Sequence, residues 1–259
     1  MAEFASQNYQ NNFLSQVIAR IDFLQCIPTD TIFKEEVEKA IIDIFPRRGM
    51  AQLIKFNTFN IVFDGVTSNV ANANNDVFDG RQREYQSLDG KNKVILSNKF
   101  LIFEINSYSG FDEHIKWMRK IFNVFFDHAK PIVNRTGIRY INIFDQSKIS
   151  LKKNYFCPEV AAVLLIKKEL VKQQHILRSM HVSEYRIDDM CLNFKYGMYN
   201  PDYPSIMTKN DFVLDLDCFT EVGIDNADDI LKTIIRGHGE IQRLFEQSIT
   251  DSLREVMLR

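Results

Sequence analysis

The chain has 259 residues, of which 45% are hydrophobic and 25% are charged, and 21 of them are phenylalanine. This composition excludes an intrinsically disordered protein, which lacks the apolar side chains needed to build a core. The formal net charge is −2, so no overall positive field attracts nucleic acid or an anionic membrane, and we expect neither as a partner.

The cysteines and the N-terminus predict where the protein works. None of the four cysteines forms a C-x-x-C pair, so we expect free thiols in a reducing compartment rather than a zinc or redox motif. The first residues lack the basic and apolar regions of a signal peptide. No segment approaches the roughly 18 apolar residues of a membrane span. The sequence therefore predicts a cytoplasmic protein that uses no metal and no cofactor.

The chain begins with alternating strand and helix patterns. Residues 16–24 alternate in polarity, which predicts a strand with two different faces. A helix is expected to begin at Asp30 or Thr31 and to end at Pro46, because apolar residues recur there at helical spacing. Another strand is predicted over 53–63.

The next segment predicts a loop followed by a hairpin. Residues 64–82 are rich in Asn, Gly and Asp, which indicates a long loop. Strands over 83–88 and 93–97 flank Asp89-Gly90, a strong hairpin signal. A third strand over 99–107 completes a predicted three-stranded meander.

The remaining elements follow the same pattern of helices between strands. Ser109 to Asp112 resembles a capping box that opens a helix ending at Pro131. Pro158 suits the first turn of a short helix over 159–170. Asn226 is expected to cap the terminal helix, which we expect to bend at Gly237 and Gly239 and to break at 248–251. The other predicted strands cover 135–144, 174–185, 190–198 and 212–219.

Strands joined by short turns, with helices between blocks of strands, predict the fold class. We expect an α+β protein with antiparallel sheet, flanking helices and a long C-terminal helix. The chain is predicted to form one domain over residues 1–259. The order of elements suggests two related halves, 14–145 and 155–259, although no sequence repeat supports them.

Five segments carry a resemblance to a known group of proteins. They are VIARIDFL at 17–24, RTGIRYIN at 135–142, YGMYNPDYP at 196–204, FVLDLD at 212–217 and FEQSITDSLREVM at 245–257. On these segments the chain resembles an uncharacterised, sporadically distributed prokaryotic protein family of about this length. The resemblance implies no activity. The patchy distribution resembles that of anti-phage or other mobile accessory genes.

Arginine and aspartate residues on three predicted strands form the first candidate site. Asp215 and Asp217 share one strand face, Arg20 shares a face with Asp22, and Arg139 lies between apolar neighbours. A structural interpretation is an ion-pair network across the sheet. A functional interpretation is a pocket in which arginine forks bind phosphate or another anion.

The same aspartate strand leaves a metal site open as an alternative. Asp211, Asp215 and Asp217 lie on one face about 7 Å apart, a spacing that would allow Mg²⁺ to bind if Glu104 joined them. A solvent-facing polar strand explains the pattern more simply. We therefore predict no metal.

His238 stands between two glycines in the predicted terminal helix. Glycine disfavours a helix by about 1 kcal/mol relative to alanine, so Gly237 and Gly239 point to a bend or to close packing. His238 is a candidate general base or ligand, but no second histidine lies at ligand spacing. Packing between helices is the simpler interpretation.

The terminal helix supplies a candidate surface for a partner protein. Its apolar stripe would either pack on the core of this chain or dock a partner or a second copy. The stripe residues considered for a partner are Ile241, Leu244, Phe245, Leu253 and Met257.

The sequence contains no P-loop, no G-x-S-x-G and no G-x-G-x-x-G motif. We therefore favour a non-enzymatic binding component that acts with a protein partner, in prokaryotic defence or toxin neutralisation. The alternative is an enzyme or sensor that binds a phosphorylated ligand or nucleic acid through the Asp/Arg cluster.

Overall fold

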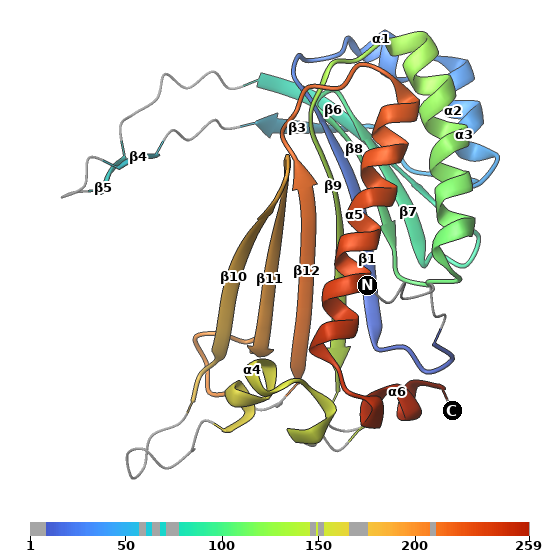
Figure 1. Cartoon of the computed structure of the whole chain (residues 1–259). Helices are drawn as coiled ribbons and strands as arrows, with labels where there is room; N and C mark the ends of the chain where they lie inside the picture. The colour runs from blue at the N-terminus through green and yellow to red at the C-terminus, as the bar shows by residue number, and fades with distance from the viewer. Residues whose placement is uncertain are drawn as a thin grey trace.

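The computed structural model describes residues 9–56, 61–63, 68–70, 78–145, 149, 153–165, 176–207 and 211–258. Helices separate blocks of consecutive strands along the chain (Figure 1). The helices are α1 (Thr29–Ile32), α2 (Glu35–Ile42), α3 (Phe111–Ala129), α4 (Pro158–Ala161), α5 (Ala227–Ser248) and α6 (Asp251–Leu258). The strands are β1 (Leu14–Phe23), β2 (Arg47–Arg48), β3 (Gln52–Phe56), β4 (Ile61–Phe63), β5 (Ser68–Val70), β6 (Phe78–Gln86), β7 (Asn92–Ser97), β8 (Phe100–Ile105), β9 (Val133–Phe144), β10 (Ser179–Ile187), β11 (Met190–Met198) and β12 (Phe212–Thr220).

One antiparallel sheet of ten strands organises the molecule. The strand order is β10-β11-β12-β9-β1-β8-β7-β6-β2, and β3 also pairs with β6. The central pair is β1 with β9, in a register that places Ile18 opposite Arg139 and Arg20 opposite Gly137. This pairing brings the N-terminal strand next to residues more than 110 positions away.

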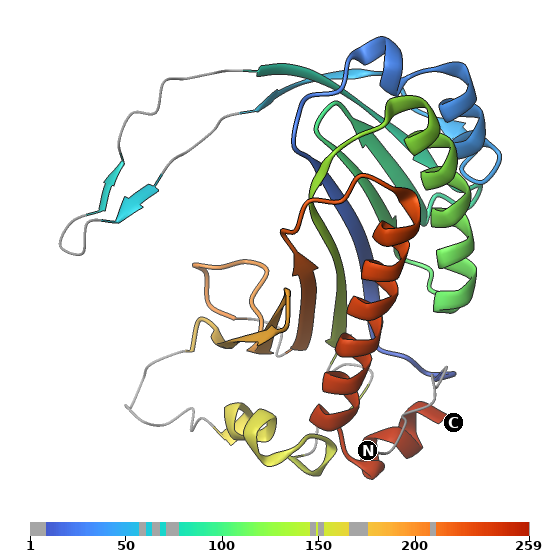
Figure 2. The same cartoon turned by 45° about the horizontal axis from the view of Figure 1, so that its top comes forward.

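The helices cover one face of this sheet (Figure 2). Alternation along β1 sends Val17, Ala19, Ile21 and Phe23 under the helices, where each is at most 3% exposed. The apolar stripes of α3 and α5 bury themselves against the same face, including Phe122 and Phe125 of α3 and Ile230, Ile234 and Ile241 of α5. The opposite face carries no helix in the described part of the chain. The predicted α+β fold is confirmed.

The connectivity runs through two similar units. β1, the helices α1 and α2, the meander β6-β7-β8 and α3 are followed by β9, α4, the meander β10-β11-β12 and α5. In each unit the first strand pairs with the last strand of its meander, and β1 and β9 join the units. If the chain is divided according to this order of elements, the boundary lies between α3 and β9, whereas the predicted halves 14–145 and 155–259 place it later. The relatedness of the halves stays a prediction.

Two predictions for the first hundred residues are wrong in detail. The single helix expected from residue 30 to 46 is broken at Phe33 and Lys34, where Lys34 is extended with ψ 142°. The break places the Phe33 ring 4.5 Å from the guanidinium carbon of Arg83. The two ends of the strand predicted over 53–63 lie in β3 and β4, and residues 57–60 lie outside the described residues. The predicted loop 64–82 contains β5 and the start of β6.

The predicted helix starts have different outcomes. The capping box at Ser109 is wrong, because Gly110 is the N-cap of α3 with φ 124° and no side chain caps it. Ser109 Oγ donates instead to the Glu113 carboxylate. The Asn226 cap is confirmed, since its Oδ1 accepts the Asp229 backbone N–H at 2.9 Å.

The terminal helix is one element through both glycines. α5 runs from residue 227 to 248 and then breaks at Ile249 and Thr250, as predicted. Ser248 does not cap α6, because its Oγ donates to the Leu244 carbonyl at 2.7 Å. The predicted helix over 159–170 is shorter, with α4 followed by a 3-10 turn at Ala162–Leu165, and 166–170 lie outside the described residues. Among the helices described, none is both long and apolar enough to cross a membrane.

Candidate functional site: the bare face of the sheet

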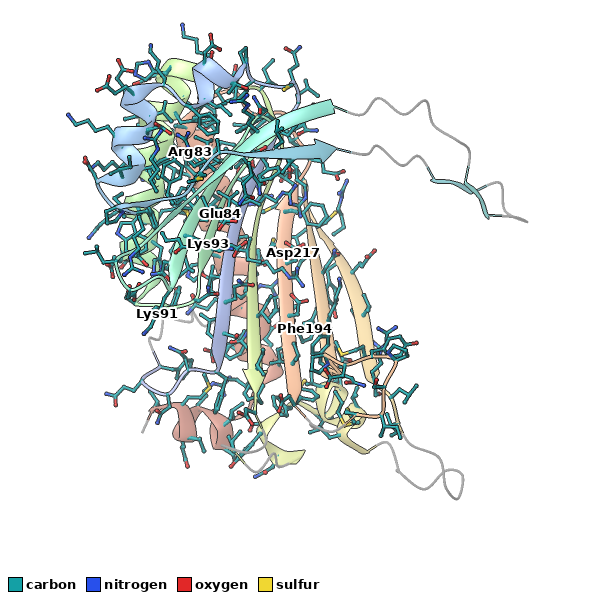
Figure 3. The ribbon with its side chains drawn as sticks, turned by 180° about the vertical axis from the view of Figure 1, so that it is seen from behind. Arg83, Glu84, Lys91, Lys93, Phe194 and Asp217 are labelled. Carbon is teal, nitrogen blue, oxygen red and sulfur yellow. The ribbon has the colours of Figure 1, made fainter. Side chains whose placement is uncertain are left out.

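The face of the sheet opposite the helices is called here the bare face, and Figure 3 views it with the helices behind. Alternation places polar side chains on it, because every second residue of β1, β9 and β12 points away from the core. The labelled Asp217, Lys93 and Glu84 come from β12, β7 and β6 (Figure 3). The candidate site is therefore a surface built from many strands.

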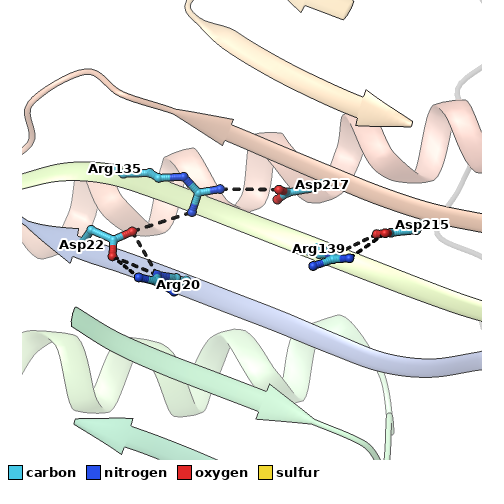
Figure 4. A network of polar contacts seen from close by, with 6 residues as sticks. All are labelled: Arg20, Asp22, Arg135, Arg139, Asp215 and Asp217. Atoms are coloured by element: carbon cyan, nitrogen blue, oxygen red, sulfur yellow. Dashed lines mark hydrogen bonds and ion pairs between the residues drawn. The ribbon is translucent and has the colours of Figure 1, made fainter. Parts of the chain in front are cut away.

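Six charged side chains on β1, β9 and β12, called here the ladder, form two separate groups of ion pairs (Figure 4). Arg20 binds Asp22 with its Nε and Nη2, at 2.9 Å and 2.6 Å from Asp22 Oδ1. Arg135 then bridges the strands, with its Nη1 at 3.8 Å from Asp22 Oδ2 and its Nη2 at 3.5 Å from Asp217 Oδ2. The predicted network across the sheet is confirmed for Arg20, Asp22 and Asp217, with Arg135 as the link.

A second pair stands beside this chain of contacts. Arg139 binds Asp215 with both ends of its fork, Nε to Oδ1 at 2.7 Å and Nη2 to Oδ2 at 2.6 Å. Asp217, not Asp215, is the register partner of Arg139. The long arginine side chain therefore reaches diagonally to the neighbouring carboxylate.

Gly137 makes room for the arginine link. It stands directly opposite Phe219 on β12 and Arg20 on β1. A Cβ at position 137 would lie 2.8 Å from Phe219 Cβ and 3.5 Å from Arg135 Nη1. The guanidinium of Arg135 stacks over the Phe219 ring, 4.5 Å from its centroid. A larger residue would push these groups apart.

The charges of the ladder are balanced and partly shielded from water. The ladder contains three arginines and three aspartates, so its formal net charge is zero. The side chains of Arg20 and Arg139 are 42% and 38% exposed, whereas that of Asp215 is 11% exposed. Burial raises the pKa of Asp217 above its usual range, although Arg135 and Arg139 oppose the shift. The bond to Asp215 is the largest influence on Arg139, and it raises the pKa of that guanidinium.

Apolar side chains and further charges surround the ladder. Ile18 and Ile141 are half-buried on this face, and Lys93 binds Glu104 with Nζ at 3.0 Å from Oε2. On β11, Lys195 stands opposite Asp215. The whole face thus alternates apolar groups with charges of both signs.

The metal alternative is not supported by this geometry. Glu104 is on β8, which β9 and β1 separate from β12, and it pairs with Lys93. Asp215 is held by Arg139. Within the described ranges, no group of three or more histidine, cysteine or acidic side chains is placed to hold a metal ion.

His238 lies on the other face of the sheet from the ladder and does not join it; packing between the helices α5 and α3, the simpler interpretation, is confirmed. Its ring stacks on Phe111 with centroids 3.8 Å apart, and its Nδ1 is 2.9 Å from Tyr140 Oη. Burial lowers the pKa of His238 to about 4. Gly237 permits this packing, because a Cβ there would lie 3.0 Å from Ile138 Cγ2, whereas Gly239 has open space around it. His238 packs α5 against the sheet.

A second histidine, His114, is buried in the same layer and is not among the predicted site residues. His114 of α3 is 1% exposed, and its ring packs against Tyr108 and Trp117. Its Nδ1 is buried with no hydrogen-bond partner, and its Nε2 is 3.4 Å from Ser109 Oγ. Burial lowers the pKa of His114 to about 4. This group is neutral at physiological pH.

The proposed partner stripe of the terminal helices is wrong, because the core of the same chain covers it. Ile241, Leu253 and Met257 are at most 2% exposed, and Leu244 and Phe245 are partly buried against the core. A salt bridge from Arg254 Nε to Glu246 Oε2 at 2.8 Å fastens α6 to α5. These side chains are not available to a partner.

Two hollows are present on the described surface, and neither contains a residue of the ladder. The larger, about 440 Å³, lies between α3 and the start of α5. The smaller, about 220 Å³, lies near β2 and β6.

Comparison with known proteins assigns no family to the chain. No family model matches it, and no curated protein matches it. A solved structure titled "Structure of Rolling Circle Replication Initiator Protein from Geobacillus stearothermophilus" is similar over 92% of this chain and 86% of that chain, at 9% identity and a TM-score of 0.32. A likeness this weak carries no argument about function.

Proposed function

We propose that this chain is a non-catalytic binding component whose bare face docks a partner protein. The observation that carries the proposal is the charge balance of the ladder on that face. Every arginine and aspartate of the ladder has a partner within the chain, and their formal charges sum to zero. A protein surface with interspersed charges of both signs is complementary to such a face.

The apolar groups of the bare face support the same partner. Ile18, Ile141 and Phe219 lie between the ion pairs and keep part of their surface in contact with water. Covering them with a protein surface stabilises a complex, because apolar area is removed from water. The surrounding charges then set the orientation of the partner.

The alternative, an enzyme or sensor for a phosphorylated ligand or nucleic acid, is supported less well. A phosphate would need an arginine fork that is free to bind it. The fork of Arg139 is taken up by Asp215, and Arg135 lies between two carboxylates. Under this alternative, Arg139→Gln would abolish binding of the phosphorylated ligand in a folded protein, because it removes the guanidinium fork that must hold the phosphate.

Two features of the proposal rest on the sequence alone. A role in prokaryotic defence or toxin neutralisation follows from the resemblance, and it stays a prediction. A cytoplasmic location also stays a prediction.

A pull-down from the native cells with two matched variants tests the proposal. Ile18→Lys places a cation on the bare face between Glu104 of β8 and Arg139 of β9, and its circular dichroism spectrum and melting temperature must match those of the wild-type protein before recoveries are compared. Ile235→Lys places the same charge on α5, where the native side chain is 43% exposed. We expect a stoichiometric protein partner that is lost with Ile18→Lys and retained with Ile235→Lys. Equal recovery with both variants would contradict docking at the bare face.

A further inference from the structure

The strand β10 forms one edge of the sheet, with no described element beyond it (Figure 1). Its two-residue connection to β11, at Asp188 and Asp189, makes Ile187 and Met190 the first pair of the hairpin. Odd-numbered residues of β10 therefore direct their backbone groups at β11, and even-numbered residues direct theirs outward. The outward groups belong to Met180, Val182, Glu184 and Arg186. This edge is a template for another strand.

The side chains of the edge have a self-complementary pattern. Glu184 and Arg186 are exposed, carry opposite charges and point to the same face, one on each side of Tyr185. Val182 and Tyr185 are 54% and 45% exposed, on opposite faces of the strand. Among the described residues, Arg186 Nη1 donates to Cys191 Sγ at 3.0 Å, and its charge also acts on the neighbouring Asp189.

We propose that β10 pairs with β10 of a second copy of this chain, antiparallel and centred on Tyr185. This register places each Glu184 opposite Arg186 of the other copy, in a pair that exchanges backbone hydrogen bonds. The two tyrosines meet on the symmetry axis. A shift by one residue in each copy would place Glu184 opposite Glu184, and a shift by two would leave it opposite Val182. The charges therefore select the register centred on Tyr185.

The opposite edge of the sheet does not suit a second copy. There both β2, which consists of Arg47 and Arg48, and β3, whose one charged residue is Lys55, pair with β6. Two like charges on a short strand repel an identical edge. Of the two edges, β10 is the one whose charges attract their own copy, and this dimer is independent of docking at the bare face.

A charge-swap series, measured by sedimentation velocity over a range of concentrations, tests the register. The wild-type protein is expected to form a dimer. Arg186→Glu or Glu184→Arg turns two attractive pairs into two repulsive ones and should weaken dimerisation by about 30-fold. The double variant Glu184→Arg/Arg186→Glu should restore it. A monomeric wild-type protein at every concentration overturns the dimer, and single variants that dimerise like wild type overturn this register.

A cysteine substitution supplies a second test that needs no change of charge. Tyr185→Cys places two thiols across the axis in a pair whose Cα atoms are about 4.5 Å apart, within disulfide range. Ser183→Cys is the control, because its two copies lie four residues apart along the strands. Oxidation should give a covalent dimer with Tyr185→Cys, above the level set by the native thiols of the wild-type protein. Equal crosslinking of both variants contradicts the proposed pairing.

Discussion

Replacing His114 with phenylalanine should make the protein less sensitive to acid. Burial lowers the pKa of His114 from 6.5 to about 4. Between pH 6.5 and pH 4, His114 is therefore protonated in the unfolded chain but not in the folded chain. The free energy of unfolding that is present above pH 6.5 is lost progressively as the pH falls toward 4. One pKa unit corresponds to about 1.4 kcal/mol, so His114 alone costs about 2 kcal/mol between pH 7 and pH 5.

His114→Phe removes this loss of stability at low pH, and it also removes the buried His114 Nδ1 that has no hydrogen-bond partner. At neutral pH it loses only the long contact to Ser109, so we expect its stability to lie within about 1 kcal/mol of wild type. Urea unfolding at about pH 7 and pH 5 measures both values. The titration of His238 and Asp217 is common to both proteins and cancels in the comparison. Equal losses of stability in the two proteins would refute the reasoning.

Three further changes test other parts of the structure. Gly137→Ala should cost about 1–3 kcal/mol, because its Cβ would lie 2.8 Å from Phe219 Cβ; an unchanged melting temperature would exclude this crowding. Glu246→Ala should cost about 3 kcal/mol, as measured by urea unfolding, because it removes the buried carboxylate that accepts from both Arg254 and Tyr9; a loss below about 1 kcal/mol would show that the ion pair does not fasten α6. Cys218, whose pKa burial raises to about 12, should resist a thiol reagent in the folded protein and react after unfolding, as the added mass will show; labelling without unfolding would contradict its burial.

Local patterns were sufficient to predict much of the fold. The alternation of β1 and the Asn226 cap depend on neighbouring residues, and both are present as predicted. The break between α2 and its neighbour α1 was missed, because it depends on Phe33 meeting Arg83 from a distant strand. A hydrophobic stripe in the sequence does not reveal whether the same chain or a partner covers it. The stripe that contains Ile241 and Met257 is covered by the core of its own chain.

The ladder was predicted because strand parity groups residues on one face. Arg135 and Arg139 are four residues apart on β9 and therefore share a face. Strand parity could thus have added Arg135 to the predicted network. Parity could not show that Arg139 would reach diagonally to Asp215, since that choice depends on side-chain length and on the register of β9 with β12. The sequence does not say which face of the sheet a helix covers, so it could not show that His238 lies on the face opposite the ladder.

The mass of the native assembly tests the central claim most directly. The tagged chain would be purified from its own cells without denaturation and measured by native mass spectrometry. Docking at the bare face predicts a complex whose mass exceeds that of the chain, or of its dimer, by that of a second protein. A chain that carries only the mass of a small molecule or a metal ion would contradict a binding component that acts with a partner protein.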